Sequence, residues 1–138
     1  MDEGLILVID DEAGMRKYLE KLLTDNGYKV VLSSNGEQGL DELSKKSPDL
    51  ALVDLKMPKM DGIEFLKRAK RVFPNLPVII MTAYASLESA IEAMRQGAYD
   101  YINKPFDMDE ILLVISKALE KKRLEEENIL LHKELKKS

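Results

Sequence analysis

The sequence predicts an α/β fold in which helices cover both faces of a parallel sheet. Five short apolar runs alternate with five segments of helical periodicity along the 138 residues. The connections are short, so each strand is expected to run parallel to the one before it through a right-handed crossover. Hydrophobic residues make up 45% of the chain, which is enough for the core of one compact domain.

The apolar runs define the predicted strands. They cover residues 5–9 (LILVI), 29–33 (KVVLS), 50–53 (LALV), 77–81 (PVIIM) and 99–103 (YDYIN). The second run is the most polar, which suits a strand at the edge of a sheet. For five strands that alternate with helices, we predict a flavodoxin-like doubly wound sheet with the strand order 2-1-3-4-5.

Capping residues mark the helices between these strands. Gly27 stands where the first helix is expected to end, because glycine accepts the left-handed conformation of a C-terminal cap. Asp61, Ser86 and Asp107 are the predicted N-caps of the third, fourth and fifth helices. These local signals agree with the strand assignments on both sides.

Composition and charge exclude several classes of function. The net charge is −4, whereas affinity for nucleic acids depends on clustered lysine and arginine, so we expect no direct nucleic-acid binding by this chain. There is no cysteine, and no apolar run approaches the roughly 20 residues of a membrane-spanning helix. The N-terminal sequence lacks the features of a secretory signal. We expect a cytoplasmic protein that makes no membrane contact.

Polar side chains stand at the carboxyl ends of four predicted strands. These residues are Asp10 and Asp11, Asp54, Thr82 and Lys104. Each has a simpler interpretation: a helix cap, a turn residue, an ordinary strand residue or a solvated charge. Carboxyl ends of parallel strands meet at one edge of the sheet, however, and ligands bind there in open α/β folds. The agreement of four strand ends favours one shared site.

The three aspartates of this set predict a metal centre that works on phosphate. Carboxylates held close together repel each other unless a cation joins them. Oxygen ligands without histidine or cysteine favour Mg²⁺ over Zn²⁺. A carboxylate can act as the nucleophile in phosphoryl transfer, and Lys104 and Thr82 would stabilise the phosphoryl oxygens. We assign the nucleophile to Asp54 because it stands alone, while Asp10 and Asp11 form a pair suited to holding metal.

Four motifs give the chain a resemblance to the receiver domains of two-component response regulators, over residues 4–121. They are VIDDE (8–12), LVDLKMPKMDG (52–62), IIMTAYAS (79–86) and YINKPF (101–106). The resemblance implies that Asp54 is the phosphoacceptor. It also implies that Asp11 and Asp54 bind Mg²⁺ together with the backbone carbonyl of Lys56, and that Asp10 acts through water.

The same resemblance implies a switch at the other side of the site. Thr82 and Lys104 would contact the phosphoryl group, Tyr101 would be the aromatic switch partner of Thr82, and the Lys104–Pro105 bond would be cis. Strand alternation places Tyr101 on the same face as Tyr99, so both could instead be simple aromatic packing.

The resemblance also implies the partners of the protein. A sensor histidine kinase would supply the phosphoryl group, and the chain would be a regulatory switch that catalyses its own phosphorylation and dephosphorylation, not a stand-alone enzyme. Residues 82–107 look most like the branch that regulates sigma-54-dependent transcription, whose full-length members add an AAA+ ATPase and a DNA-binding domain.

Two other classes of function stay open at this point. Phosphatases of the haloacid dehalogenase type also use an aspartyl nucleophile. Their pattern is a D-x-D arrangement on the first strand, whereas this chain has DDE at that place. A scaffold that does not turn over phosphate is the second alternative. The chain contains no GxxxxGK[ST], GxGxxG or GxSxG motif, so a nucleotide-dependent enzyme or a serine hydrolase is not expected.

The C-terminal segment predicts a helix longer than the receiver fold needs. Residues 109–137 contain neither glycine nor proline, and about 29 helical residues would extend for roughly 43 Å. We divide the chain into a receiver domain, residues 1–121, and a helical linker, residues 122–138, that leads to an output domain.

The linker also carries a heptad pattern. Leu124, Asn128, Leu131 and Leu135 follow the spacing of a coiled coil, with Asn128 at an a position, where asparagine favours a parallel dimer. A homodimer is therefore expected. The alternative is a solvated helix held by charge pairs, because two heptads are marginal by themselves.

Overall fold

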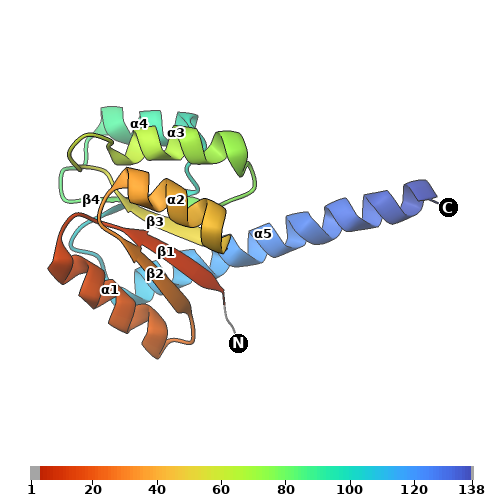
Figure 1. Ribbon diagram of the computed structural model, residues 1–138, viewed down its shortest axis with the longest axis horizontal. Coiled ribbons are helices and arrows are strands. Elements are labelled where there is room, and N and C mark those ends of the chain that lie inside the picture. Colours follow the sequence, from red (N-terminus) through yellow and green to blue (C-terminus); the bar gives the residue numbers. More distant parts are fainter. Residues whose placement is uncertain (1–3, 138) are drawn as a thin grey trace.

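Five parallel strands form one central sheet in the order β2-β1-β3-β4-β5, as the sequence predicts (Figure 1). The computed structural model describes residues 4–137. Residues 1–3 of the predicted receiver domain and residue 138 of the predicted linker lie outside the described residues. The strands are β1 (Leu5–Ile9), β2 (Lys29–Ser33), β3 (Leu50–Asp54), β4 (Val78–Thr82) and β5 (Asp100–Asn103).

Helices cover the sheet on both faces. They are α1 (Ala13–Asp25), α2 (Gly36–Lys46), α3 (Gly62–Val72), α4 (Leu87–Arg95) and α5 (Met108–Lys137). Buried residues of α2, α3 and α4 share one apolar cluster with the sheet, and buried residues of α1 and α5 share the cluster on the opposite face. The central strands β3 and β4 are buried along their whole length, which explains why they read as continuous apolar runs.

The predicted caps are present. The Asp61 side chain accepts a hydrogen bond from the backbone N–H of Glu64 at the start of α3, and Ser86 accepts one from Ser89 at the start of α4. Gly27 follows α1 with φ of 92°, a left-handed conformation that glycine adopts without strain. These caps fix where the loops at the two ends of the sheet begin.

The expectation that Tyr99 and Tyr101 share a face is wrong. Strand β5 begins at Asp100, so Tyr99 lies before the strand and does not follow its alternation. Tyr101 packs against the cluster under α2, α3 and α4, whereas Tyr99 packs against the cluster under α1 and α5. The ammonium group of Lys121 lies 5.9 Å from the centre of the Tyr99 ring. The two tyrosines therefore belong to different parts of the molecule.

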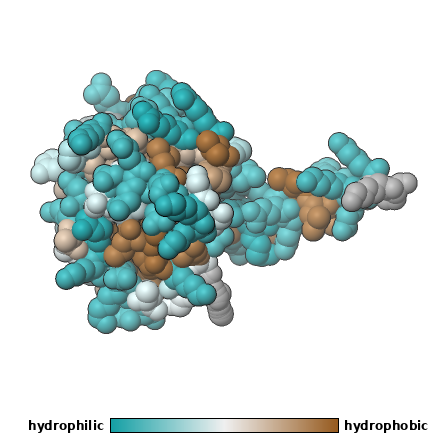
Figure 2. All heavy atoms as spheres, viewed as in Figure 1, coloured by the Kyte–Doolittle hydropathy of each residue, from teal (hydrophilic) through white to brown (hydrophobic). Residues whose placement is uncertain are grey.

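Helix α5 projects from the domain, as predicted (Figure 1). Its first part packs on the sheet, where Ile111, Ile115 and Ala118 are buried. Its last part extends away from the body, and Figure 2 shows apolar atoms on it between hydrophilic ones. No helix within residues 4–137 is both long and apolar enough to cross a membrane.

Candidate functional site

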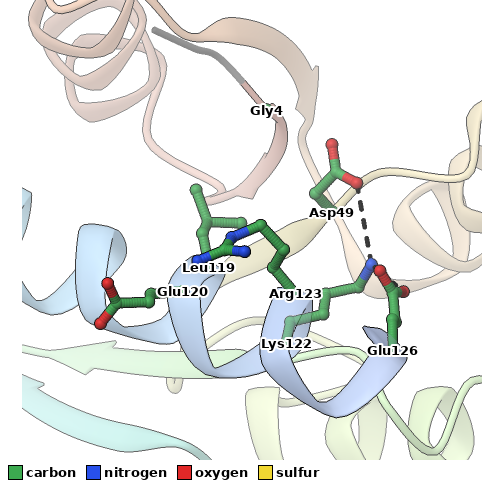
Figure 3. A pocket seen from close by; sticks show the side chains of 7 residues that line it. All are labelled: Gly4, Asp49, Leu119, Glu120, Lys122, Arg123 and Glu126. Atoms are coloured by element: carbon green, nitrogen blue, oxygen red, sulfur yellow. Dashed lines mark hydrogen bonds and ion pairs between the residues drawn. The ribbon is translucent and has the colours of Figure 1, made fainter. Parts of the chain in front are cut away.

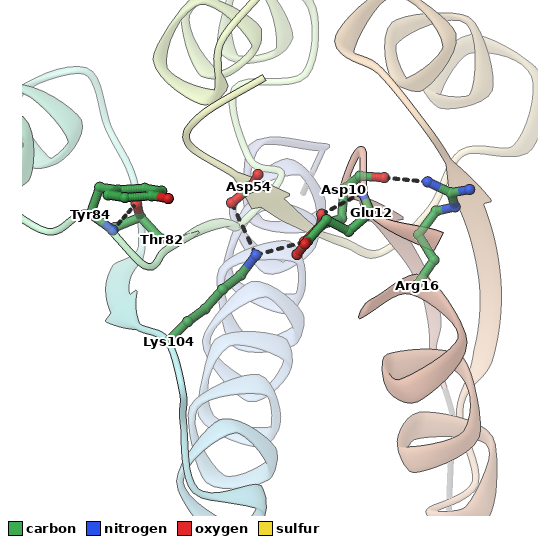
Figure 4. Close-up of polar contacts among 7 residues, drawn as sticks. All are labelled: Asp10, Glu12, Arg16, Asp54, Thr82, Tyr84 and Lys104. Atoms are coloured by element: carbon green, nitrogen blue, oxygen red, sulfur yellow. Dashed lines mark hydrogen bonds and ion pairs between the residues drawn. The ribbon is translucent and has the colours of Figure 1, made fainter. Parts of the chain in front are cut away.

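The predicted polar residues meet at the carboxyl edge of the sheet (Figure 4). Asp54 is the last residue of β3 and Thr82 is the last residue of β4, while Asp10 and Lys104 directly follow β1 and β5. Strand register aligns Ile9 with Val53, which brings the residues after them, Asp10 and Asp54, side by side. The parallel register thus gathers groups that are far apart in the sequence.

One lysine joins two buried carboxylates at this edge. The Lys104 ammonium donates to Asp10 Oδ2 at 2.8 Å and to Asp54 Oδ1 at 3.1 Å. Asp10 is fully buried and Asp54 is 6% exposed. Asp11 is exposed at the rim, and carboxylate oxygens of Asp10, Asp11 and Asp54 lie within 4.8 Å of one another. This cluster of three carboxylates beside one ammonium is the acidic site.

The electrostatics of the acidic site shift the pKa values of its two central groups. Burial, followed by repulsion from Asp10, raises the pKa of the Asp54 carboxyl to about 6, although the contact with Lys104 opposes the shift. Burial by itself lowers the pKa of Lys104, but hydrogen bonds and attraction to Asp10 and Asp54 outweigh it, so this pKa is raised. Lys104 is therefore a permanent cation at neutral pH.

The donor set fits a hard divalent cation. The three ligand groups offer only carboxylate oxygens, which Mg²⁺ prefers, and one of them reaches the solvent. Among the described residues, this is the one group of three or more acidic, histidine or cysteine side chains close enough to share an ion. Lys56, whose backbone carbonyl is the fourth predicted ligand, lies two residues after Asp54 with its side chain exposed.

The predicted switch residues occupy the side of the acidic site next to β4 and β5. Thr82 is fully buried, and its Oγ1 accepts a hydrogen bond from the backbone N–H of Tyr84 at 2.9 Å. The O–H of Thr82 therefore stays available as a donor. Lys104 also donates its backbone N–H to the carbonyl of Thr82, and the Lys104–Pro105 bond is cis, as the resemblance implied.

Tyr101 is connected to the first turn of α4. Its hydroxyl shares a hydrogen bond with Ser89 Oγ, and Ser89 Oγ also bonds to Oγ of the N-cap Ser86 at 2.9 Å. Ser89 could not be recognised in the sequence, because a serine in the first turn of a helix carries no signal beyond capping. The contact couples the ring of Tyr101 to the start of α4.

Gly62 is a second residue at the site whose role is visible only in the structure. A Cβ at this position would lie 2.7 Å from the carbonyl oxygen of Asp54 and 3.0 Å from Cα of Leu55. The Gly62 N–H also donates to the Leu55 carbonyl at 2.9 Å. Glycine here lets the start of α3 pass directly behind Asp54, and only the turn propensity of glycine could be recognised in the sequence.

A separate cavity lies at the opposite edge of the sheet, where α5 leaves the domain (Figure 3). It has a volume of about 480 Å³ and is lined by residues of α5 together with Gly4 and Asp49. Lys122 lies 3.8 Å from Asp49 Oδ1, and the other Asp49 oxygen accepts the N–H of Leu5 at 2.8 Å. These contacts attach α5 to the amino edge of the sheet, away from the acidic site.

The predicted linker residues are far from the acidic site. Leu124, Leu131 and Leu135 are 51%, 57% and 72% exposed, and Asn128 is exposed between them. On a helix, Leu124 lies about 200° around the axis from Lys122, which faces Asp49. The heptad positions therefore point away from the domain to which the helix belongs.

Comparison with known proteins gives consistent matches. Residues 6–116 match the family described as response regulator receiver domain. The transcriptional regulatory protein ZraR of Klebsiella oxytoca is 47% identical over 121 residues, which are 88% of this chain and 27% of that protein. The DNA-binding transcriptional regulator NtrC of Klebsiella pneumoniae is 43% identical over 119 residues, 86% of this chain and 25% of that protein.

Solved structures show the same architecture. The crystal structure of a response regulator receiver domain protein from Clostridium thermocellum superposes with a TM-score of 0.85 at 35% identity, covering 88% of this chain and 98% of that one. By contrast, the chain spans only about a quarter of the length of the two transcriptional regulators.

Proposed function

The chain belongs to the response regulator receiver family, related to regulators of the NtrC type, and on this premise we propose that it is a phosphoacceptor switch. A partner histidine kinase would present a phosphohistidine, and Asp54 would take the phosphoryl group in a Mg²⁺-dependent reaction. The observation that carries this proposal is the acidic site, in which Asp54 lies beside Asp10, Asp11 and Lys104.

The reaction transfers the phosphoryl group from nitrogen to oxygen. A carboxylate oxygen of Asp54 forms the new O–P bond, the P–N bond of the phosphohistidine breaks, and the electron pair of that bond stays on the histidine of the kinase. Mg²⁺ held by Asp10, Asp11, Asp54 and the Lys56 carbonyl would neutralise charge on the carboxylates and the phosphoryl oxygens. Lys104 would exchange its contact with Asp54 for the phosphoryl group, and the Thr82 O–H would donate to it.

The structural response would begin at Thr82. Movement of its hydroxyl toward the phosphoryl group breaks the hydrogen bond with the N–H of Tyr84, which frees the loop between β4 and α4. Tyr101 would respond because its hydroxyl is bonded to Ser89 in the first turn of α4. Phosphorylation would thus bias two arrangements of the segment from β4 to β5.

The output would lie outside this chain. We assign residues 1–121 to the receiver and residues 122–138 to a linker that dimerises through Leu124, Asn128, Leu131 and Leu135. In the complete protein the linker would join the receivers to a DNA-binding output domain, and the relationship to NtrC supports activation of sigma-54-dependent transcription. The chain itself would be regulatory and would have no substrate besides its phosphodonor.

Asp54→Asn is the direct test of the phosphoacceptor. The amide is a poor nucleophile, so incubation with acetyl phosphate and Mg²⁺ should add no phosphoryl mass to this variant, while the wild type gains one group. Lys104→Ala should reduce phosphorylation or its structural response and leave metal binding intact. Intact-mass spectrometry measures all three proteins.

Asp49→Asn is the matched control, because Asp49 immediately precedes the first residue of the same strand β3 and lies at the opposite edge of the sheet. It should be phosphorylated like the wild type. A full phosphoryl gain on Asp54→Asn would refute the assignment, and repeated release of phosphate from small substrates would indicate a phosphatase instead.

A further inference from the structure

Arg16 contacts the acidic site through the backbone. Its Nη1 donates to the carbonyl oxygen of Asp10 at 2.7 Å from the second turn of α1 (Figure 4). The side chain is half-buried, and among the described residues it forms no ion pair with any of the three aspartates. Arg16 is therefore bound to the peptide that joins Asp10 to Asp11 and not to a carboxylate of the acidic site.

Asp10 is held on every side. Its N–H donates to the carbonyl of Ser33 at 3.2 Å, and its Oδ1 accepts the N–H of Glu12 at 3.0 Å. Its Oδ2 accepts from Lys104. The carbonyl oxygen is the last polar atom of the residue, and Arg16 is the group that engages it. With this contact, each polar atom of Asp10 has a partner, and the peptide that leads to Asp11 is anchored at its carbonyl oxygen.

We propose that Arg16 is a positioning residue for the metal centre: it fixes the loop between β1 and α1 so that Asp10 and the exposed Asp11 face the same ion. The proposal rests on the proposed function, since it concerns the metal used in phosphorylation. Arg16 touches neither the phosphoryl group nor the ion; it acts through the carbonyl that it binds.

The charge and the hydrogen bond of Arg16 have opposite effects on Mg²⁺ binding. A guanidinium near the site repels a cation, so loss of the charge alone would make binding tighter. An anchored loop keeps the carboxylates in place, so loss of the hydrogen bond would make binding weaker, and groups that orient metal ligands typically change affinity by about 10- to 100-fold. The sign of the change therefore separates positioning from electrostatics.

Four variants of the full chain test the proposal. Arg16→Ala and Arg16→Met each remove both the charge and the hydrogen bond. Alanine has a high helix propensity, so Arg16→Ala should still fold. Arg16→Lys keeps the charge and a hydrogen-bond donor on a side chain of similar length. Lys17→Met is the control, because Lys17 is an exposed cation on the same helix turn and forms no hydrogen bond or ion pair with Asp10. Calorimetric titration with Mg²⁺ after chelation measures the dissociation constants.

Arg16→Ala and Arg16→Met should raise the dissociation constant of Mg²⁺ about tenfold, while Arg16→Lys should stay close to the wild-type value and Lys17→Met at or below it. At saturating Mg²⁺, both weak binders should regain a phosphorylation rate close to that of the wild type. Binding by Arg16→Ala and Arg16→Met that is as tight as in the wild type, or tighter, would overturn the positioning role. Failure of the wild type to bind Mg²⁺ would instead refute the proposed function.

Discussion

Lys104 is the residue on which the metal-free acidic site depends. It supplies the ammonium between Asp10 and Asp54, and all three side chains are at least nine-tenths buried. Two neighbouring carboxylates in such a place would otherwise repel each other without compensation. From the sequence, the three aspartates are expected to repel each other unless a cation joins them, whereas in the structure Asp10 and Asp54 are already paired with Lys104.

Lys104→Met should therefore lower the free energy of unfolding by about 3 kcal/mol in the presence of chelator, because breaking a buried pair leaves uncompensated charge. Adding Asp54→Asn to this variant should recover part of the loss. Mg²⁺ should also stabilise the variant by binding the folded state alone. Urea titration measures each protein, with Lys46→Met as an exposed-lysine control. Equal stability of Lys104→Met and wild type would show that the pair contributes nothing.

The raised pKa of Asp54 predicts how stability depends on pH. A carboxyl with a pKa of about 6 in the folded state and about 3.9 when unfolded binds more protons when folded across the interval between these values. Its contribution to stability is fully present below about pH 4 and is lost as the pH rises through about 6. Without Mg²⁺, Asp54 thus destabilises the fold at neutral pH.

Asp54→Asn removes this titration and serves as the comparison. Between about pH 4 and about pH 7 in chelator, the wild type should lose on the order of 2 kcal/mol of stability relative to Asp54→Asn. Thermal melts of both proteins across this range give the difference. A constant difference would mean that Asp54 titrates normally in the folded protein.

Close approach between α2 and β1 is a property of whole elements that depends on Gly39. A Cβ on Gly39 would lie 2.3 Å from Cδ1 of Ile9 and 3.2 Å from Cε1 of Phe65. The helix can therefore lie directly on the strand whose end carries Asp10. Gly14 in α1 offers a contrast, since a Cβ there would meet nothing within 4 Å.

Gly39→Ala and Gly14→Ala should consequently change stability in opposite directions. Overpacking against Ile9 should cost Gly39→Ala about 1–3 kcal/mol, despite the better helix propensity of alanine. Gly14→Ala should gain about 0.5–1 kcal/mol from that same propensity. Chemical denaturation of the two variants measures both effects, and a stabilised Gly39→Ala would mean that Ile9 can move aside at no cost.

The shape of the whole molecule is set by α5, which is both a layer of the fold and an extension from it (Figure 1). Asp49 and Lys122 attach the helix to the domain at the point where it leaves the sheet. Beyond that point the apolar heptad positions point away from the receiver, so two helices can pair without displacing either domain.

A dimer through this helix can be tested with one pair of substitutions. Leu131→Glu places a charge on the heptad stripe and should give monomers, while Ile129→Glu, at an exposed position off the stripe, should leave the dimer intact. A chain that ends at Lys122 should also be monomeric. Light scattering of each protein at high micromolar concentration, with and without a phosphoryl mimic, gives the mass. A wild type that stays monomeric in both states would make the linker a simple spacer.

The sequence was sufficient to predict the sheet, its strand order and the residues of the acidic site. Those features depend on local chemistry: apolar runs make buried strands, capping residues end helices, and parallel strands bring their carboxyl ends to one edge. The residues Asp10, Asp54, Thr82 and Lys104 could be recognised because each stands at the carboxyl end of a strand, either as its last residue or directly after it. The long α5 was equally visible, since nothing in residues 109–137 stops a helix.

Other features depend on contacts between segments that the sequence does not place next to each other. The pairing of Lys104 with Asp10 and Asp54 required the exact direction of three side chains. Tyr99 left the alternation of β5 because the strand begins one residue later than its apolar pattern. The bond from Arg16 to the Asp10 carbonyl and the approach of Gly62 to Asp54 depend on packed distances, which follow from the folded arrangement and not from residue type.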